Sequence, residues 1–322
     1  MPDPHEPHDA RPVLTLAHSP DPDDAFMWWP ITGKVRPDGM QVSPPVIDTG
    51  RFRFAALPAD IEVLNRRAAE VGDLDITALS FRAWGNVRER YVVTRTGSSF
   101  GEGFGPKVVR RADSEKVHCV NCLRGGDVRI AIPGRRTTAF LVLGMLLGRE
   151  RVAKEGKVVE MPFERIIAAV AEGEVDAGLV IHEGQLLYEQ AGLKLVVDLG
   201  KWWQEQTGLP LPLGCNAVRR DLDARFGAGS VDEVSRTLRR SVDYALEHRR
   251  ESLEYTLPFA LANAAKPGGS GAPTLERVDE YVKMYVNRWT VDMGPEGLAA
   301  VQRLFDEGAR AGLCDTVAVD AI

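Results

Sequence analysis

The 322-residue sequence lacks several features that would identify a class of protein at once. No apolar run approaches the roughly 20 residues that span a bilayer, so we expect no membrane segment. The net charge of −6 argues against a general nucleic-acid-binding surface. Residues 1–12 lack the charged and apolar regions of a secretory signal, and we expect them to be a short disordered tail on a cytoplasmic protein.

Cysteine is also scarce. The four cysteines are too few and too scattered for a disulfide-stabilised scaffold. His118-Cys119-x-x-Cys122 has the residues of half a zinc site or of a redox pair, but the sequence has no second closely spaced pair of Cys or His residues. A solvent-exposed loop is the favoured interpretation, so we predict no metal site and no cofactor.

The common catalytic and nucleotide-binding motifs are missing as well. The chain has no Rossmann glycine fingerprint, no P-loop and no H-E-x-x-H zinc motif. It also lacks the motif order of a Ser-His-Asp hydrolase. The function must therefore be sought in the arrangement of the predicted strands and in the residues that follow them.

The chain alternates short apolar strands with helical segments, which indicates an α/β fold with parallel strands. Strands are expected at 13–17, 75–80, 91–96, 128–132, 157–161 and 177–181. Glycine-rich residues 97–105 and proline-rich residues 207–214 predict two crossings between domains, with a compact α/β unit from about 103 to 206. Further on, Ser230-Val231-Asp232-Glu233 predicts a capping box that opens a helix reaching about residue 254.

The most informative segment runs from Gly173 to Glu183 and consists of a turn, a buried strand and a histidine. The apolar run Ala177–Ile181 is typical of a parallel strand covered on both faces. Ligands of open α/β sheets bind outside the carboxyl ends of such strands, where His182 follows. Because the pKa of histidine suits proton transfer near neutrality, His182 is our candidate general base. The alternative is a structural histidine whose hydrogen bonds are satisfied.

Hydroxyl residues follow two other strands. Thr137 and Thr138 stand between the 128–132 strand and a helix. Free backbone N–H groups and threonine hydroxyls at a helix N-terminus form an anion site suited to a carboxylate. An ordinary capped helix start is an equally good interpretation. Ser80, at the end of another strand, has the same two interpretations.

The segment from Ser19 to Asp24 concentrates three aspartates after the first strand. Their spacing lacks the pattern of a calcium-binding loop. For Asp21 we expect helix capping by a solvated carboxylate. Asp23 and Asp24 are candidates to accept hydrogen bonds from the hydroxyls of a polar substrate. His18, at the end of the same strand, is either a core residue or a residue of the cleft.

Five motifs, taken in this order, resemble the 1,4-dihydroxy-6-naphthoate synthase family of the futalosine route to menaquinone. They are residues 18–27, 98–107, 132–139, 173–183 and 209–214. The resemblance implies a periplasmic-binding-protein type 2-like α/β fold, with two lobes, two crossings and a ligand cleft between the lobes. It further implies a discontinuous larger lobe of residues 13–100 and 210–322 and a smaller lobe of residues 103–206.

The same resemblance implies carbon–carbon lyase chemistry on cyclic dehypoxanthine futalosine, which releases 1,4-dihydroxy-6-naphthoate without a metal or redox cofactor. At the matching positions it makes His182 the general base, and it implies a small-molecule substrate with a carboxylate. The predicted substrate-binding set is Ser80, Thr137, Thr138, Ala139, Ile181, Asp23, Asp24 and Ser19. Of these, Ser80, Thr137 and Thr138 would hold the carboxylate or neighbouring oxygens.

Two alternatives share the expected fold. One is a non-catalytic solute-binding or ligand-sensing protein, since the fold alone does not separate binding from catalysis. The other is the related chorismate dehydratase. The Ile181-His182-Glu183 motif and the motif from Ser19 to Phe26 fit the naphthoate enzyme better.

Overall fold

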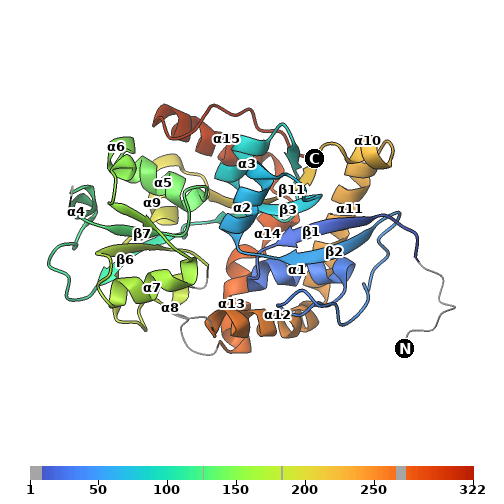
Figure 1. Ribbon diagram of the computed structural model, residues 1–322, viewed down its shortest axis with the longest axis horizontal. Coiled ribbons are helices and arrows are strands. Elements are labelled where there is room, and N and C mark those ends of the chain that lie inside the picture. The colour runs from blue at the N-terminus through green and yellow to red at the C-terminus, as the bar shows by residue number, and fades with distance from the viewer. Residues whose placement is uncertain (1–8, 126, 183, 266–272) are drawn as a thin grey trace.

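The computed structural model describes residues 9–125, 127–182, 184–265 and 273–322. Their strands form two separate sheets, which lie in the two halves of the molecule in Figure 1. The chain passes from the first sheet to the second between residues 101 and 107, and it returns between residues 198 and 211. This two-lobed α/β architecture confirms the predicted fold class, while the lobe boundaries stay a prediction.

The first sheet has the order β2-β1-β3-β11-β4, with β5 also paired to β11. Strand β1 is parallel to both β2 and β3, and β11 runs antiparallel to β3. The strand bounds are β1 Val13–His18, β2 Arg53–Pro58, β3 Ile76–Ser80, β4 Tyr91–Val93, β5 Ser99–Gly101 and β11 Leu211–Arg219. The carboxyl ends of β1 and β3 therefore lie at the same edge of this sheet.

The second sheet has the order β10-β6-β9-β7-β8. Strand β7 is parallel to β8 and β9, whereas β6 is antiparallel to β9 and β10. The strand bounds are β6 Lys107–Arg111, β7 Ile130–Ile132, β8 Val158–Glu160, β9 Ala177–Val180 and β10 Leu193–Asp198. Again two parallel strands, β7 and β9, end at the same edge.

Helices cover both faces of each sheet, as Figure 1 shows for α5 and α7 on opposite sides of the second sheet. The earlier helices are α1 Pro22–Thr32, α2 Ile61–Glu70, α3 Phe81–Val87, α4 Val120–Arg124, α5 Thr138–Leu147, α6 Arg149–Ala153, α7 Phe163–Ala171 and α8 Gly184–Leu187. The later ones are α9 Leu199–Thr207, α10 Leu222–Phe226, α11 Ser230–Glu247, α12 Arg249–Ala264, α13 Leu275–Tyr285, α14 Arg288–Val291 and α15 Gly294–Arg310.

One cluster of buried apolar side chains runs through both lobes. Trp84 and Phe305 of the first lobe and Leu143 and Leu179 of the second are all members, and each is fully buried. Helix α5 contacts both α3 and α15, which brings these side chains together. Packed side chains therefore join the lobes in addition to the two crossings.

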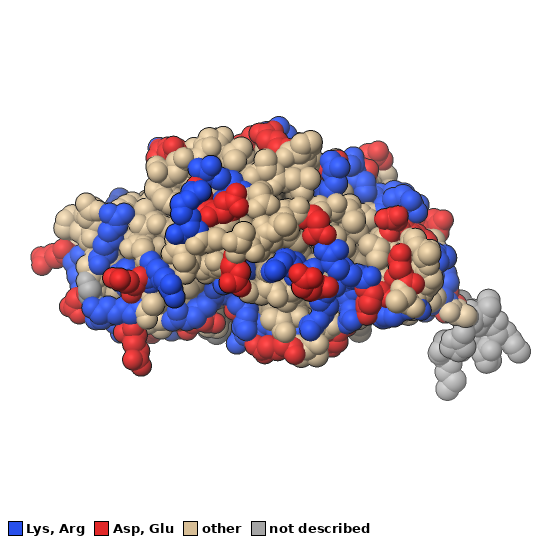
Figure 2. All heavy atoms as spheres, turned by 90° about the horizontal axis from the view of Figure 1, so that it is seen from above, with Lys and Arg blue, Asp and Glu red and all other residues tan. Residues whose placement is uncertain are grey.

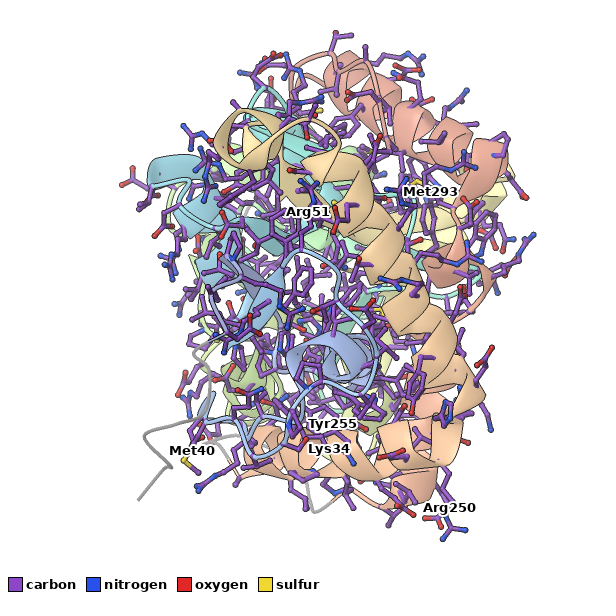
Figure 3. The ribbon with its side chains drawn as sticks, turned by 90° about the vertical axis from the view of Figure 1, so that its right-hand side faces the viewer. Lys34, Met40, Arg51, Arg250, Tyr255 and Met293 are labelled. Atoms are coloured by element: carbon purple, nitrogen blue, oxygen red, sulfur yellow. The ribbon has the colours of Figure 1, made fainter. Side chains whose placement is uncertain are left out.

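The prediction of one helix from Ser230 to about residue 254 is wrong in two respects. The segment is divided at His248 into α11 and α12, and the residue that caps α11 is Gly229. The hydroxyl of Ser230 donates to the Gly227 carbonyl at 2.6 Å, and Glu233 binds Arg51 at 2.5 Å. Arg51 is labelled in Figure 3. Because both side chains of the expected capping box have other partners, the box does not form.

Two residues that the sequence assigned to a disordered tail contact the folded chain. Residues 1–8 lie outside the described residues. The Arg11 guanidinium donates to Thr49 Oγ1 at 3.1 Å and to the Gly50 carbonyl at 3.0 Å. The backbone N–H of Arg53 donates to the Pro12 carbonyl at 2.9 Å. Residues 11 and 12 therefore pack against the molecule.

Charges of both signs are intermixed over the face shown in Figure 2, where no large patch of one sign stands out. Within the described parts of the chain, no helix has both the length and the apolar character that crossing a membrane requires.

The close packing of α7 on β9 yields a first test. A Cβ added to Gly178 would lie 2.5 Å from Ile166 Cγ2 and 2.7 Å from Val170 Cγ2. We expect Gly178→Val to lower the free energy of unfolding by about 1–3 kcal/mol or more, because the added volume forces the helix from the sheet. Urea unfolding followed by circular dichroism measures the change.

The control is Leu195→Val on the edge strand β10, where the side chain is 43% exposed. Its effect should stay within about 0.5 kcal/mol. Equal unfolding free energies for Gly178→Val and wild type would show that α7 does not pack on β9 as described.

Candidate active site

Two pairs of parallel strands, one pair from each lobe, end at one cavity. Strands β1 and β3 reach it from the first lobe, and β7 and β9 from the second. The cavity holds about 780 Å³ of space between atoms, including its open mouth. Every predicted catalytic or substrate-binding residue lines it: Ser19, Asp23, Asp24, Ser80, Thr137, Thr138, Ala139, Ile181 and His182. The structure thus brings the predicted set together, and the individual roles remain proposals.

The pair Asp21–His182 spans the cavity from one lobe to the other. Asp21 Oδ2 lies 2.9 Å from His182 Nδ1. The carboxyl group of Asp21 is 1% exposed, and the amide of Asn263 donates to its other oxygen at 3.3 Å. Asp21 makes no side-chain capping bond to α1. The expectation of a solvated capping carboxylate is therefore wrong, and the Asp21 carboxyl group instead contacts His182.

His182 also has an unusual backbone. Its φ of 54° makes it the one non-glycine residue with positive φ in the described part of the chain. This left-handed conformation costs a non-glycine residue free energy and is concentrated at functional sites. The Phe163 ring meets the imidazole edge to face, with 4.7 Å between ring centroids. The backbone turn and the aromatic contact together direct the imidazole toward Asp21.

Asp23 and Asp24 place two more carboxyl groups beside Asp21. Burial, with the neighbouring carboxylates of Asp24 and Asp21, raises the pKa of Asp23 well above its ordinary value. Burial likewise raises the pKa of Asp24 to about 6, although the Ser19 N–H donates to its Oδ2 at 2.8 Å. Asp23 Oδ1 is buried with no hydrogen-bond partner among the described residues. A protonated Asp23 can therefore donate a hydrogen bond to a ligand in the cavity.

The two threonines are held by the protein itself. Thr137 caps α5, since its Oγ1 accepts from the Phe140 N–H at 3.1 Å. Thr138 Oγ1 donates to the Leu213 carbonyl at 2.7 Å and accepts from the Arg82 N–H at 3.2 Å, which links the lobes. The groups left for a ligand are the first backbone N–H groups of α5, which have no acceptor within the helix. Ala139, which has no polar side-chain atom, lines the cavity at this helix start.

Ser80 belongs to a buried polar chain that reaches the lobe boundary. Its N–H donates to Asn65 Oδ1 at 3.0 Å, and the Asn65 amide donates to Ser80 Oγ at 3.1 Å and to Glu62 Oε2 at 3.2 Å. Burial raises the pKa of Glu62 to about 7. A Cβ on Gly134 would lie 2.5 Å from the Glu62 carboxyl group, so a larger residue at this position would displace the Glu62 side chain at the lobe boundary.

Sequence reasoning missed several residues of the cavity. Gln185 Nε2 donates to the Tyr285 hydroxyl at 2.8 Å, and that hydroxyl lies 3.0 Å from Gln185 Oε1. Both residues are buried, and they join α8 to α13 across the cavity.

His18 is not among the residues that line the cavity. Burial lowers its pKa to about 4, and its Nδ1 lies 2.6 Å from the Ser19 carbonyl oxygen. His18 is a core histidine.

Solved structures with low sequence identity share this arrangement of two lobes around a cavity. A ligand-binding component of an ABC-type import system from Staphylococcus aureus superimposes with a TM-score of 0.62 at 13% identity, covering 97% of both chains. A Candida albicans protein described as having the generic periplasmic binding protein structural fold gives a TM-score of 0.61 at 12% identity, covering 95% of this chain and 92% of that one. The protein therefore belongs to the periplasmic-binding-protein-like class of folds.

More similar proteins narrow this class. The chain is 40% identical over 305 residues to a 1,4-dihydroxy-6-naphtoate synthase of Thermus thermophilus, covering 94% of this chain and 96% of the relative. It is 32% identical over 311 residues to the synthase of the same name from Streptomyces coelicolor, covering 96% and 98%. A crystal structure of an Archaeoglobus fulgidus protein matches with a TM-score of 0.75 at 37% identity, covering 94% and 98%.

Residues 14–310 also match the family model described as "Menaquinone biosynthesis". The chain belongs to this menaquinone biosynthesis family, which confirms the family resemblance found in the sequence. The names of the relatives indicate an enzyme rather than a transport-associated binding protein.

The buried Glu62 carboxyl group yields a pH-dependent prediction. Its pKa is about 7 in the folded protein, against an ordinary value of 4.5. Between these two pH values the folded protein therefore holds a proton that the unfolded chain has lost. The wild-type free energy of unfolding should fall as pH rises through that interval. Glu62→Gln does not titrate and should gain about 1–2 kcal/mol relative to wild type between pH 5 and pH 8.

Urea unfolding of both proteins at the two pH values measures this difference. Glu89→Gln is the matched control, because the Glu89 side chain is 91% exposed. Its stability relative to wild type should not change with pH. If the unfolding free energies of Glu62→Gln and wild type differed by the same amount at both pH values, this would contradict the presence of a buried proton on Glu62.

Proposed function

We propose that this protein is a carbon–carbon lyase that converts cyclic dehypoxanthine futalosine to 1,4-dihydroxy-6-naphthoate, with His182 as the general base. The observation that carries the proposal is the buried Asp21–His182 pair, 2.9 Å apart, inside the cavity shared by the two lobes. Membership of the menaquinone biosynthesis family supports the choice of pathway. The cytoplasmic location stays a prediction.

The contact with Asp21 sets the protonation pattern of the imidazole. When Nδ1–H donates to Asp21 Oδ2, the basic lone pair of the neutral ring lies on Nε2. Nε2 then accepts the substrate proton, and the Asp21 carboxylate stabilises the imidazolium ion that forms. General base catalysis of this kind contributes typically about 10²–10⁴-fold to the rate.

The remaining cavity residues hold the substrate in this proposal. The first N–H groups of α5, at Thr138 and Ala139, bind the substrate carboxylate with the positive end of the helix dipole. Ser80 Oγ, which accepts from Asn65, keeps its own proton for a substrate oxygen. Protonated Asp23 donates a hydrogen bond to a sugar-derived hydroxyl of the substrate. This contact gives a partner to the carboxyl group, whose Oδ1 is otherwise buried without one.

Contact between the lobes completes the site. Asp21 comes from the first lobe and His182 from the second, so the base is oriented only when the lobes are together. A closed cavity excludes water and holds the substrate in a reactive position. After proton removal, cleavage of the carbon–carbon bond releases the sugar-derived fragment and yields an aromatic ring, and aromatisation drives the reaction forward.

The first test concerns the base. Incubation of the purified protein with cyclic dehypoxanthine futalosine should give 1,4-dihydroxy-6-naphthoate, detected by mass spectrometry. We expect His182→Ala to fold normally and to lose about 10²–10⁴-fold in turnover, because no other group at that position takes the proton. His248→Ala changes an exposed histidine at the α11–α12 junction and should keep wild-type turnover.

Two outcomes would contradict the proposal. Wild-type turnover in His182→Ala would remove His182 from the role of base. Tight binding of the compound without product from the wild-type protein would instead support a binding or sensing protein of the same fold.

Asp21 is proposed to position the base rather than to contact the substrate. We expect Asp21→Asn to lower kcat by about 10²-fold or more with a smaller change in KM, because an amide can favour the wrong imidazole tautomer. Steady-state kinetics with the same substrate separates the two constants. The control is Asp38→Asn, since the Asp38 side chain is 56% exposed. A change in KM alone would show that Asp21 contributes to substrate binding and not to the orientation of His182.

A further inference from the structure

Three side chains with metal-binding atoms meet in the connection between β6 and β7. Cys119 Sγ lies 2.8 Å from Cys122 Sγ, and Cys122 Sγ lies 3.5 Å from His118 Nε2. All three atoms lie within 4.8 Å of one another. No other group of three or more His, Cys, Asp or Glu side chains in the described residues approaches a common point in this way. None of the three lines the active-site cavity.

The local backbone directs both sulfurs to the same side. Cys119 precedes α4 and Cys122 lies within it, and the Cys122 N–H donates to Cys119 Sγ at 3.4 Å. On either side of the cluster, Val117 and Leu123 are fully buried and anchor the segment in the core. The three donor atoms are therefore held together by the fold of the segment, although the side chains that carry them reach the surface.

The donor set and the distances fit zinc. Zinc binds thiolate sulfur at about 2.3 Å and imidazole nitrogen at about 2.0–2.1 Å, usually with tetrahedral geometry. In that geometry two bound sulfurs lie roughly 3.8 Å apart, and a sulfur and a nitrogen roughly 3.5 Å apart. The Cys122–His118 distance already has this value. The two sulfurs have to separate by about 1 Å, which rotation of the half-buried Cys side chains allows.

In contrast to the sequence-based prediction of a solvent-exposed loop without a metal site, we propose that His118, Cys119 and Cys122 bind one Zn²⁺ ion. Three protein ligands leave the fourth position to water or to a side chain of another molecule. The ion would join residues 118 and 122 and so stabilise the connection between β6 and β7. This site is independent of the proposed lyase reaction.

Zinc binding by the full-length chain tests the proposal. The reduced protein, stripped of metal and desalted, is titrated with Zn²⁺ in competition with a chromophoric chelator. We expect one tightly bound ion per chain. Cys119→Ser and Cys122→Ser should each lower the affinity more than about 100-fold, since even the loss of an outer contact costs 10–100-fold. Cys314→Ser removes another half-buried cysteine outside the cluster and should leave the affinity unchanged.

Cobalt supplies a second readout. Co²⁺ should give a thiolate-to-metal absorption band in wild type and Cys314→Ser, and not in the double variant Cys119→Ser/Cys122→Ser. Equal zinc uptake by wild type and the double variant would overturn the proposal. The proposal would also be overturned if the wild-type chain bound no zinc and a small-molecule disulfide oxidised Cys119 and Cys122 to a disulfide. The pair would then be a redox site.

Discussion

The structure of the site depends on one buried contact, that between the Asp21 carboxylate and the His182 imidazole. A carboxylate that is 1% exposed is costly to bury unless hydrogen bonds and a positive or polar partner compensate it. Partners come from both lobes, since Asn263 donates a hydrogen bond and the His182 imidazole also contacts the carboxylate. The position of the histidine is thus tied to the position of the lobes.

This constraint explains the electrostatics around it. Asp23 and Asp24 lie beside the buried Asp21, and burial together with like charge raises the pKa of both groups. In the proposed reaction the imidazole removes a proton from one atom of the substrate, while a protonated carboxyl group donates a hydrogen bond to another. Such separation of roles between buried titratable groups is typical of enzymes that carry out acid–base chemistry near neutral pH.

The contacts between the lobes are polar on the cavity side and apolar beneath it. Thr138 and Leu213, and Gln185 and Tyr285, are hydrogen-bonded across the cavity. Trp84, Phe305 and Leu143 belong to the packed cluster that both lobes share. The apolar cluster packs the two lobes together, whereas the polar contacts determine how the two sets of strand ends face each other.

The amino-acid sequence by itself determined the α/β alternation and the residues at the ends of four strands. Those signals are local, because apolar runs of strand length and the residues after them lie within about ten positions of each other. Only the tertiary structure decided that Asp21 meets His182, that Gln185 meets Tyr285, and that Cys119 and Cys122 point toward His118. The first two pairings join distant segments through the docking of two lobes, and sequence periodicity has no information about docking. The capping box at Ser230 failed for a related reason, since Glu233 found a partner in Arg51 from a distant loop.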